Sequence, residues 1–511
     1  MFLDSGSLLE YNTHNTHKKG WDTLSHPVES TFPGWMSAAR ETNIVRRING
    51  FLASPFFIIT VGLLTVFANV LGAELYVYSA FIFCGLYISI LGDDYLPIMP
   101  MVVCSYIAPS IFNNPGRSED SIFYPKNGGI YLLSIFLLFV VSVFVRLIRD
   151  KELGGRNFLF AKRRFFWGMI ALGGAYVLAG AFSGRYFEHG LNNLVFALLQ
   201  FISIFAFYWF FTGSVRWDRA PRDYFAWCGF AVGFVVLFEI LNIYLVGDVV
   251  NSAGVIILDP EKSAIFTGWG NANNIGCMLA MMVPFAFCLA RGRRNGWIFC
   301  ILGVAMTVGV FFTCSRASIL GALFATLCCF VLILKSSKNR KANLIATISA
   351  VLFAIAIVII FHETIIGLFW GLIDKKLDPS ARNHIYYNGL KQFSELPIFG
   401  GSFFPAADAG IYEWSNLEAF TSFFPPRWHS TAIQLLASCG ITGVLAYGFH
   451  RFQTIKLFLE RRKTGVVYIA LAIVTLLLMS LLDCHMFNIG PVLFYSMALA
   501  FAEKVKIEKN V

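Results

Sequence analysis

The sequence predicts an all-α, polytopic integral membrane protein with about 12–14 transmembrane helices. Its mean hydropathy is +0.66 and 57% of its 511 residues are hydrophobic, whereas soluble domains usually reach about 45–50%. Only 14% of the residues are charged, and they gather between apolar runs. Because a chain in hydrocarbon must satisfy its own backbone hydrogen bonds, such runs are predicted to be helices.

A helix needs roughly twenty residues to cross the hydrocarbon layer. The sequence contains about fourteen apolar runs that approach this length. The second and third runs contain several prolines and are separated by "LGDDYLP", and the eighth is polar at its start. A re-entrant or broken helix is the alternative for these runs. The runs lie near residues 52–72, 76–91, 95–113, 128–147, 165–183, 191–213, 224–246, 274–290, 297–313, 317–334, 343–362, 430–449, 466–482 and 486–502.

The distribution of lysine and arginine predicts the orientation, because basic loops are retained in the cytoplasm. With both termini in the cytoplasm, about 30 of the 40 lysines and arginines face inward and about 10 face outward. Three polar regions then lie outside: the turn at residues 314–316, the segment 248–274 and the largest hydrophilic stretch, 363–428. Since long loops tend to be functional, we expect the chemistry on the outer side.

Four parts of the chain follow from this topology. Residues 1–47 are polar and lack the pattern of a cleaved leader, so they are interpreted as an uncleaved, partly disordered cytoplasmic tail. Residues 48–250 are predicted to form an N-terminal transmembrane bundle, and residues 251–503 a transmembrane core that includes the outer loop 363–428. Residues 504–511 are predicted to be a second cytoplasmic tail.

The sequence predicts neither a cofactor, nor a metal site, nor a nucleic-acid partner. Most of the 11 cysteines lie inside apolar segments without zinc or redox spacing, so they are interpreted as small buried hydrophobes. His14, His17 and His26 lack the acidic or cysteine partners of a metal site. The net charge of +10 fits basic cytoplasmic loops better than nucleic-acid binding.

Arg316 lies in the middle of the apolar stretch "GVFFTCSRASILGALF", where hydrocarbon cannot solvate a guanidinium that stays charged. It shares the predicted outer face with Arg382 of the outer loop and His429 at the start of the twelfth run. The alternative for a single arginine is snorkelling to lipid phosphates or pairing with one carboxylate. Three basic groups on one face favour a functional site.

These three residue types suit the transfer of a glycan from a diphosphate. Two arginines bind a diphosphate through several charge-assisted hydrogen bonds, and they stabilise the charge that develops as the diphosphate leaves. A histidine, with an ordinary pKa of about 6.5, accepts a proton from an attacking hydroxyl at neutral pH. We therefore expect Arg316 and Arg382 to bind the diphosphate and His429 to be the catalytic base.

Four segments resemble the bacterial O-antigen ligase and O-antigen polymerase superfamily. "TCSRAS" is similar to its S-R turn between two helices, and "SARNHIYYNGLKQFSELPIFGGS" to its arginine before an aromatic-rich helix and a P-x-x-G turn. "HSTAIQLLASCGITG" resembles its helix start with a histidine and downstream glycines, and "GWGNANNIGCMLAMMVPF" its Asn-containing helix before the S-R turn. The resemblance covers roughly residues 265–450.

The resemblance implies a GT-C-like membrane glycosyltransferase that is metal-independent and inverting. The implied donor is a glycan on undecaprenyl diphosphate, and the implied acceptor is a hydroxyl of a glycan or lipid. The implied location is the bacterial cytoplasmic (inner) membrane, with the active site facing outward and membrane lipids as further partners. Carried over residue by residue, Arg316 and Arg382 engage the diphosphate and His429 is the general base.

Three further residues are candidate substrate contacts, namely Arg427, Asn274 and Ser315. A salt bridge to Glu413 or Glu418 is the alternative for Arg427. A helix cap is the alternative for Asn274, because asparagine is common at helix starts.

Some residues around the three basic groups depart from the superfamily pattern. Ser430 follows the histidine where the superfamily often has Asn, and Ala317 and Ser318 follow the arginine where a glycine is common. Such changes are expected to alter acceptor contacts and leave the diphosphate clamp intact. Asp483 and His485, in a short outer turn, are interpreted as helix caps.

The alternative function is a lipid-linked oligosaccharide flippase or another polysaccharide transporter, which also has many spans and cationic cavities. A transporter places broken helices and polar residues near the bilayer midplane, in paired halves. Here the charges gather beside one large outer loop, which favours chemistry at the membrane surface. Within the transferase hypothesis, a ligase and a polymerase differ only in the acceptor, and the sequence does not separate them.

Overall fold

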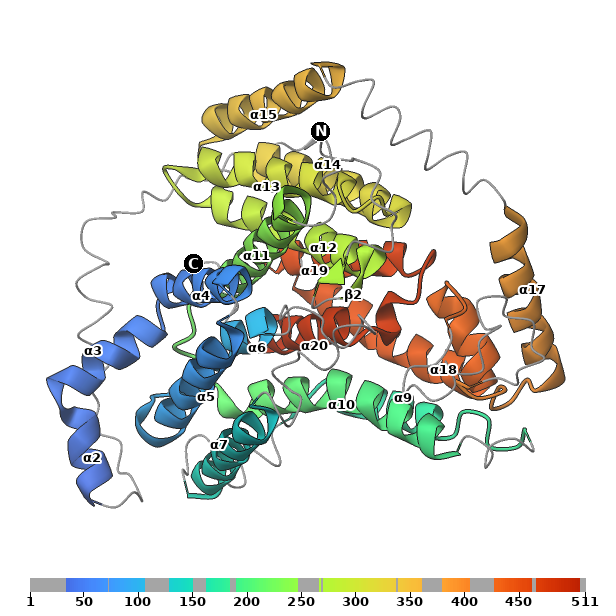
Figure 1. The fold of residues 1–511 in the computed structure, drawn as a ribbon, viewed down its shortest axis with the longest axis horizontal. Coiled ribbons are helices and arrows are strands. Elements are labelled where there is room, and N and C mark those ends of the chain that lie inside the picture. Colours follow the sequence, from blue (N-terminus) through green and yellow to red (C-terminus); the bar gives the residue numbers. More distant parts are fainter. Residues whose placement is uncertain are drawn as a thin grey trace, which may run out of the picture.

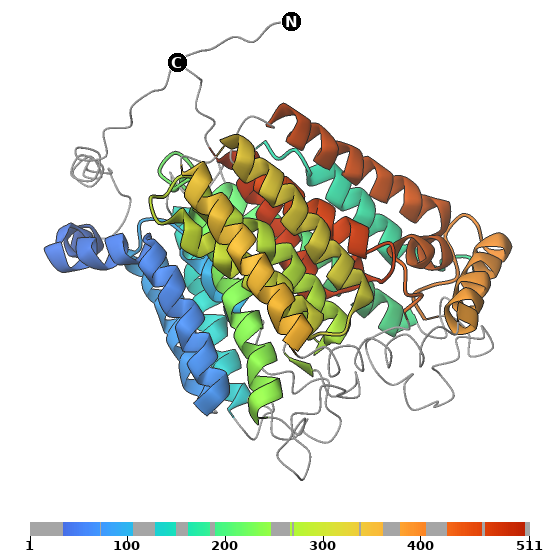
Figure 2. The same cartoon turned by 90° about the horizontal axis from the view of Figure 1, so that it is seen from above.

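Helices running side by side build nearly all of the described chain (Figures 1 and 2). The one sheet among the described residues is an antiparallel pair of two-residue strands, β1 Phe266–Thr267 and β2 Gly270–Asn271. The predicted all-α fold is confirmed. The computed structural model describes residues 34–71, 73–105, 128–149, 162–183, 190–246, 266–267, 270–336, 339–360, 379–404, 427–461 and 466–505.

The helices fall into an N-terminal and a C-terminal series along the described chain. The first series is α2 Gly34–Glu41, α3 Asn43–Leu52, α4 Pro55–Leu71, α5 Glu74–Leu91, α6 Ile98–Ser105, α7 Gly129–Arg149, α9 Phe166–Val177, α10 Gly190–Ser214 and α11 Tyr224–Val246. The second is α12 Ala272–Arg291, α13 Gly296–Phe311, α14 Arg316–Ser336, α15 Arg340–Ile360, α17 Pro379–Glu395, α18 Thr431–Glu460, α19 Val467–Met479, the 3₁₀ helix η6 His485–Phe487 and α20 Ile489–Lys504.

The described helices are those of an integral membrane protein. Seven are long and apolar enough to cross a membrane, or eight if the bent pair of α3 and α4 is one span. Three further apolar helices, α9, α13 and α19, have only 12, 16 and 13 residues. Each of the fourteen predicted apolar runs overlaps a described helix. The prediction of about 12–14 spans counted the shorter helices as spans too.

The end of the predicted N-terminal tail is helical where it is described. Residues 34–47 lie in α2 and α3, which leave the bundle at an angle (Figure 2), and the bend between α3 and α4 is 69°. The Asn49 amide of α3 donates to the carboxylate of Asp93 and to the carbonyl of Leu91 (both 3.1 Å), which fastens α3 to the end of α5. The predicted disorder of residues 1–33 falls outside the described residues.

α12 forms the centre of the C-terminal half and packs against α11, α13, α14 and α19. Of its membrane-length window, 83% is buried, the largest share among the described candidate spans. Its 20 residues continue past Pro284 without a break in the helix. The eighth predicted run is therefore a continuous helix, and its polar start has a structural cause described below.

Basic residues of the described loops gather at one end of the bundle. Between α12 and α13, the Arg293 guanidinium donates to the carboxylate of Asp223 and lies 4.7 Å from the ring centre of Trp227. The Asn339 amide, directly before α15, donates to the carbonyl of Arg294 (2.9 Å). Because successive helices alternate in direction, the starts of α12, α14 and α18 lie at the opposite end.

α18 is broken at Gly440, where φ is 62° and ψ is −155°. A break in an apolar helix leaves backbone amides and carbonyls that need other partners. The turn at residues 397–402, which follows α17, supplies these partners through four backbone hydrogen bonds. The bonds run from the Ile441 amide to the Pro397 carbonyl (2.8 Å), from Thr442 to Ile398 (3.2 Å), from Gly401 to Ala437 (2.8 Å) and from Ser402 to Ser438 (3.2 Å).

The glycines of the "PIFGG" turn and of the break are needed because the two backbones approach so closely. A Cβ at Gly440 would lie 2.5 Å from the Pro397 carbonyl oxygen, and a Cβ at Gly400 would lie 2.4 Å from the Ser438 carbonyl carbon. Both glycines also have positive φ, 62° and 67°. The turn therefore fixes α17 against the broken helix α18, beside the start of α18.

Gly440→Ala should destabilise the protein strongly, because the new methyl group meets backbone atoms and the φ/ψ pair is almost exclusive to glycine. The backbone conformation alone costs about 1–3 kcal/mol. The measurement is the midpoint of thermal unfolding of the purified full-length protein in detergent. Gly448→Ala is the matched control in the same helix, since nothing lies within 4 Å of its added Cβ.

The control variant should be unchanged or more stable, because alanine exceeds glycine in helix propensity by about 1 kcal/mol. Equal midpoints for the two variants would contradict the role given to the break.

Candidate functional site

The candidate site lies at the end of the bundle where the starts of α12, α14 and α18 meet the turn between α19 and α20. The Ser318 hydroxyl at the start of α14 donates to the carbonyl of Asn273 in α12 (3.3 Å). The amide of Thr431, the first residue of α18, donates to the carbonyl of Ser480, directly after α19 (2.9 Å). Segments far apart in the sequence therefore converge here.

His429 lies directly before the cap of α18 in an unusual backbone conformation, with φ of 50°. A left-handed conformation costs a non-glycine residue about 1–2 kcal/mol, so its surroundings must fix it. The Tyr386 hydroxyl of α17 donates to the His429 carbonyl (3.0 Å), and the adjacent Trp428 is buried with Ile385 of α17 and Ala437 of α18. α17 therefore positions the backbone of His429, whose side chain is 21% exposed.

Asp483 joins this histidine to the start of α12. One carboxylate oxygen, Oδ1, lies 3.8 Å from His429 Nδ1 and accepts a hydrogen bond from the Cys484 amide (2.7 Å). The other, Oδ2, accepts one from the Asn273 side chain (2.7 Å). Burial alone raises the pKa of Asp483, but the neighbouring histidines and the Cys484 amide together hold that pKa well below its usual value. The carboxylate is therefore charged throughout the physiological pH range.

His485 is close to the same carboxylate but differs from His429 in its surroundings. It is fully buried, whereas the His429 side chain is partly exposed. Burial lowers the pKa of His485 although the charge of Asp483 opposes this, and the charge of Arg427 adds to the lowering. His485 is therefore neutral at physiological pH, and His429 is the histidine that a substrate can reach.

The pairing of Asp483 with His429 was missed by sequence reasoning, which interpreted Asp483 as a helix cap. The signal in the sequence is an acidic residue in the mostly apolar stretch "LLMSLLDCHMF". That signal does not say which residue the carboxylate meets. The contact arises because the turn after α19 is brought against the start of α18.

Arg316 is the first residue of α14 and is exposed, at the same end of the bundle. The turn before it contains Cys314 with φ of 52°. Ser315, a predicted substrate contact, is 1% exposed, and its hydroxyl shares a hydrogen bond with Ser318 (2.9 Å). The Asn273 carbonyl accepts a hydrogen bond from the Ser318 hydroxyl, and the Asn273 side chain donates one to Asp483. Asn273 therefore links the turn before Arg316 to Asp483.

Arg382 lies in α17, one helical turn before Tyr386, and its side chain is outside the described part of the structure. α17 itself is fastened next to His429 by the Tyr386 hydrogen bond and by the Gln392 amide, which donates to the Ala437 carbonyl (2.8 Å). The predicted diphosphate-binding arginine is thus on the helix that contacts the predicted base.

Arg427 is half-buried two residues before His429. Its guanidinium donates to the carbonyl of Phe487 (3.1 Å) and lies 5.5 Å from the ring centre of Phe196. The alternative partners considered from the sequence, Glu413 and Glu418, lie outside the described residues. Arg427 therefore ties the segment before α18 to η6.

The asparagines that make the start of α12 polar have partners in the site. Asn273 donates to Asp483, and Asn274 accepts a hydrogen bond from the amide of Asn488, directly before α20. The polar start of the eighth predicted run is therefore explained by tertiary hydrogen bonds to the turn between α19 and α20.

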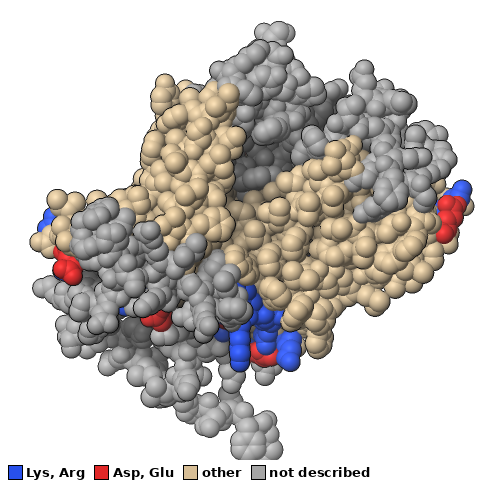
Figure 3. Space-filling model, turned by 90° about the horizontal axis from the view of Figure 1, so that it is seen from below, with Lys and Arg blue, Asp and Glu red and all other residues tan. Residues whose placement is uncertain are grey.

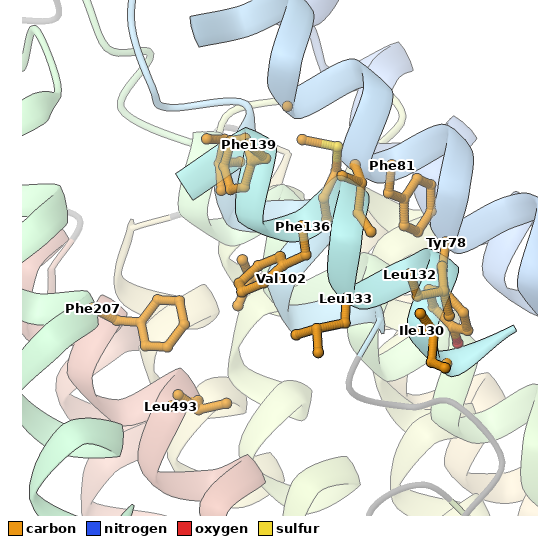
Figure 4. Close-up of a pocket in the computed structure, with 15 residues that line it drawn as sticks. Tyr78, Phe81, Val102, Ile130, Leu132, Leu133, Phe136, Phe139, Phe207 and Leu493 are labelled. Carbon is orange, nitrogen blue, oxygen red and sulfur yellow. The ribbon is translucent and has the colours of Figure 1, made fainter. Parts of the chain in front are cut away.

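A cavity with a volume of about 640 Å³ lies elsewhere, between α5, α6, α7, α10 and α20. Figure 4 shows Phe207 and Leu493 on one side of it, facing apolar side chains of α5, α6 and α7. No charged residue and no predicted site residue lines it. A diphosphate therefore finds no counter-charge in this cavity.

Within the described residues, no group of three or more His, Cys, Asp or Glu side chains is arranged to hold a metal ion. All 11 cysteines are free.

Residues 301–448 match the family model described as O-antigen ligase, which confirms the resemblance to the O-antigen ligase superfamily. The matched range contains Arg316, Arg382 and His429, whereas Asp483 follows it. A comparison with curated proteins gave no match. With its apolar helices, the chain is an integral membrane protein, and residues 301–448 are similar to the O-antigen ligase family model.

Asp483→Asn should lower stability at neutral pH by about 1–3 kcal/mol, because a buried, hydrogen-bonded charge is lost. The pKa of Asp483 in the folded protein lies below the value of about 3.9 for an unfolded aspartate. Its contribution is therefore present above about pH 4 and is lost as the pH falls through the folded pKa. Thermal midpoints of wild type and variant should converge below about pH 4.

Asp223→Asn is the control, because the Asp223 side chain is 44% exposed at the other end of the bundle. Its effect on the midpoint should be small. A difference between wild type and Asp483→Asn that stays constant down to low pH would show that the charge of Asp483 does not stabilise the fold.

Proposed function

We propose that this protein transfers a glycan from undecaprenyl diphosphate to a hydroxyl of a glycan or lipid acceptor, with His429 as the general base. The observation that carries the proposal is the His429 imidazole next to the buried, charged Asp483, beside α17 and the Arg316 turn. The motif resemblance and the family match support the same reaction class.

The Asp483 carboxylate orients the base. A carboxylate beside Nδ1 favours the tautomer with the proton on Nδ1, which leaves the lone pair of Nε2 to accept a proton. It also stabilises the imidazolium that forms. Asn273 and the Cys484 amide hold the carboxylate itself, so the imidazole is aimed before substrate arrives.

Arg316 and Arg382 bind the diphosphate. Their planar guanidinium groups match phosphate oxygens, and their charge stabilises the diphosphate more strongly as its negative charge develops. The exposure of Arg316 at a helix start, beside the site and not within the core, suits a headgroup that enters from the membrane surface.

In the proposed reaction, the acceptor hydroxyl loses its proton to His429 Nε2 while its oxygen attacks the anomeric carbon. The bond from that carbon to the diphosphate oxygen breaks on the opposite side, so the configuration inverts. The electron pair leaves with the lipid diphosphate, between the two arginines. The proposed chemistry uses no metal ion and no cofactor.

We place the site on the outer face of the bacterial cytoplasmic membrane. The described basic loops lie at the other end of the bundle, and such loops are retained in the cytoplasm. A ligase and a polymerase use the same clamp and base, so the two differ in the acceptor alone. Mass analysis of the lipid-linked intermediate in a deletion strain separates them: accumulated polymer indicates a ligase and accumulated single units a polymerase.

His429→Asn should reduce turnover by about 10²–10⁴-fold, because the amide cannot accept the proton. Asparagine tolerates positive φ better than most residues, so this variant keeps the backbone of His429. The assay follows conversion of lipid-linked donor by purified protein in detergent. A near-normal yield of product from the His429→Asn variant would show that His429 is not the general base. If the wild-type protein leaves the donor intact, a flippase is favoured.

Arg316→Gln and Arg382→Gln should each lower turnover by about 10²–10³-fold, since each removes charge from the leaving diphosphate. Arg340→Gln is the matched control, because Arg340 is also an exposed first residue of a helix, α15, at the other end of the bundle. It should retain full activity. Equal losses in all three variants would indicate a general effect of surface charge.

Asp483→Asn should reduce kcat by about 10–100-fold, as for other groups that orient a reacting imidazole. Its acid limb in the pH–rate profile should move to lower pH, because the imidazolium loses a neighbouring negative charge. An unchanged profile would limit Asp483 to a structural role.

A further inference from the structure

A second pocket, with a mainly charged lining, lies at the end of the bundle opposite the candidate site, where the start of α9 meets the ends of α18 and α20. Its volume is about 340 Å³, at the small end of the range for ligand pockets. Its lining combines four cations, two carboxylates and one apolar side chain. The lining residues are Lys162, Arg163, Arg164, Arg461, Glu460, Glu503 and Leu457.

The charge of this pocket is positive even after its ion pairs are formed. Glu460 pairs with Arg164 (2.5 Å), and Glu503 pairs with Lys504 beside the pocket (3.3 Å). Each carboxylate thus already has a cation. With four cations and two carboxylates, the lining carries a formal surplus of positive charge, which favours an anion.

Two of the cations are positioned by the protein. The Arg163 side chain donates to the Thr212 hydroxyl (2.9 Å) and to the Trp209 carbonyl (3.2 Å), both in α10. The Arg461 guanidinium donates to the Val505 carbonyl after α20 (2.8 Å). Because these side chains are already ordered, an anion bound here costs little additional side-chain entropy.

Exposed apolar side chains lie close in sequence to the residues that line the pocket. Trp167 is 69% exposed in the first turn of α9, three residues after Arg164. Leu459 is 64% exposed on α18, which packs against α9. A tryptophan beside basic groups is typical of the boundary between membrane and water. Basic groups and exposed apolar side chains are therefore both present near these helix ends.

We propose that this pocket binds the phosphate headgroup of an anionic phospholipid, with the acyl chains lying along α9 and α18. Basic pockets between helices at a membrane surface recognise such headgroups. The apolar surface next to the cations favours a lipid over a free phosphate. On the face seen in Figure 3, Lys and Arg side chains lie around an acidic side chain at the lower edge of the described surface, and other charged side chains lie at its left and right edges.

The lipid site is separate from the glycan-transfer site, although both use α18 and α20. From residue 441 to Glu460, α18 rises about 30 Å, which is the thickness of the hydrocarbon layer. His429 lies before one end of α18, and Arg461 follows the other. The bound lipid therefore fastens three helix ends in the membrane leaflet opposite the candidate site.

The test measures binding of brominated phosphatidylglycerol to the full-length protein in a neutral detergent. Bromine atoms on the acyl chain quench nearby tryptophan, and the difference between wild type and Trp167→Phe isolates Trp167 from the other tryptophans. We expect half-maximal quenching of Trp167 at a lower lipid fraction for phosphatidylglycerol than for brominated phosphatidylcholine. Equal values for the two lipids would overturn the proposal.

Variants that change one charge test whether the lipid binds in this pocket or is attracted by the overall positive charge of the protein. Lys162→Gln should weaken binding about five-fold, and Glu460→Gln should strengthen it by a similar factor, because one charge near a lipid surface has about this effect. Lys341→Gln, at an exposed lysine of α15 outside the pocket, should change nothing. Opposite effects of the two pocket variants cannot come from misfolding, whereas equal effects of Lys162→Gln and Lys341→Gln would overturn the site.

Competition with inorganic phosphate tests whether the pocket binds a lipid headgroup or a soluble phosphate. Millimolar phosphate should leave the quenching of Trp167 by phosphatidylglycerol unchanged. Complete displacement of the lipid by millimolar phosphate would assign the pocket to a soluble anion and overturn the lipid proposal.

Discussion

The requirement that every backbone group in an apolar bundle be hydrogen-bonded determines the geometry of the candidate site. α18 breaks at Gly440, and the turn after α17 supplies the partners that the break leaves open. This exchange brings α17, with Arg382 in its first turn, against the start of α18. Once α17 is fixed there, Tyr386 can hold the strained backbone of His429. The conformation that presents the histidine thus depends on backbone pairing some distance away.

A single buried carboxylate then connects the remaining helices to this histidine. The Asp483 carboxylate lies next to His429 and accepts a hydrogen bond from the Asn273 side chain. The Asn273 carbonyl in turn accepts a hydrogen bond from Ser318 at the start of α14. A charge taken out of water is costly unless such partners surround it, so the turn after α19, the start of α12 and the segment before α18 are mutually constrained. The same charge lies beside the imidazole that we propose as the general base.

α18 and α20 carry polar groups at both of their ends. At one end are the segments next to His429 and Asn488, and at the other are Arg461 and Glu503. The same two helices are therefore anchored at both membrane surfaces. Ion pairs and the proposed lipid headgroup hold them at one surface, and the contacts of the candidate site hold them at the other.

The sequence by itself determined the all-α membrane fold, because hydropathy and length act within each segment. It also indicated Arg316 and His429, because a basic residue beside an apolar run is recognisable without knowledge of its neighbours, and Arg382 through the motif resemblance of the outer loop. Only the tertiary structure decided that Asp483 meets His429, that Ser315 is buried and that the polar start of α12 faces the turn after α19. Those relations, like the basic pocket, join segments far apart in the chain, and local patterns do not record which helix ends pack together.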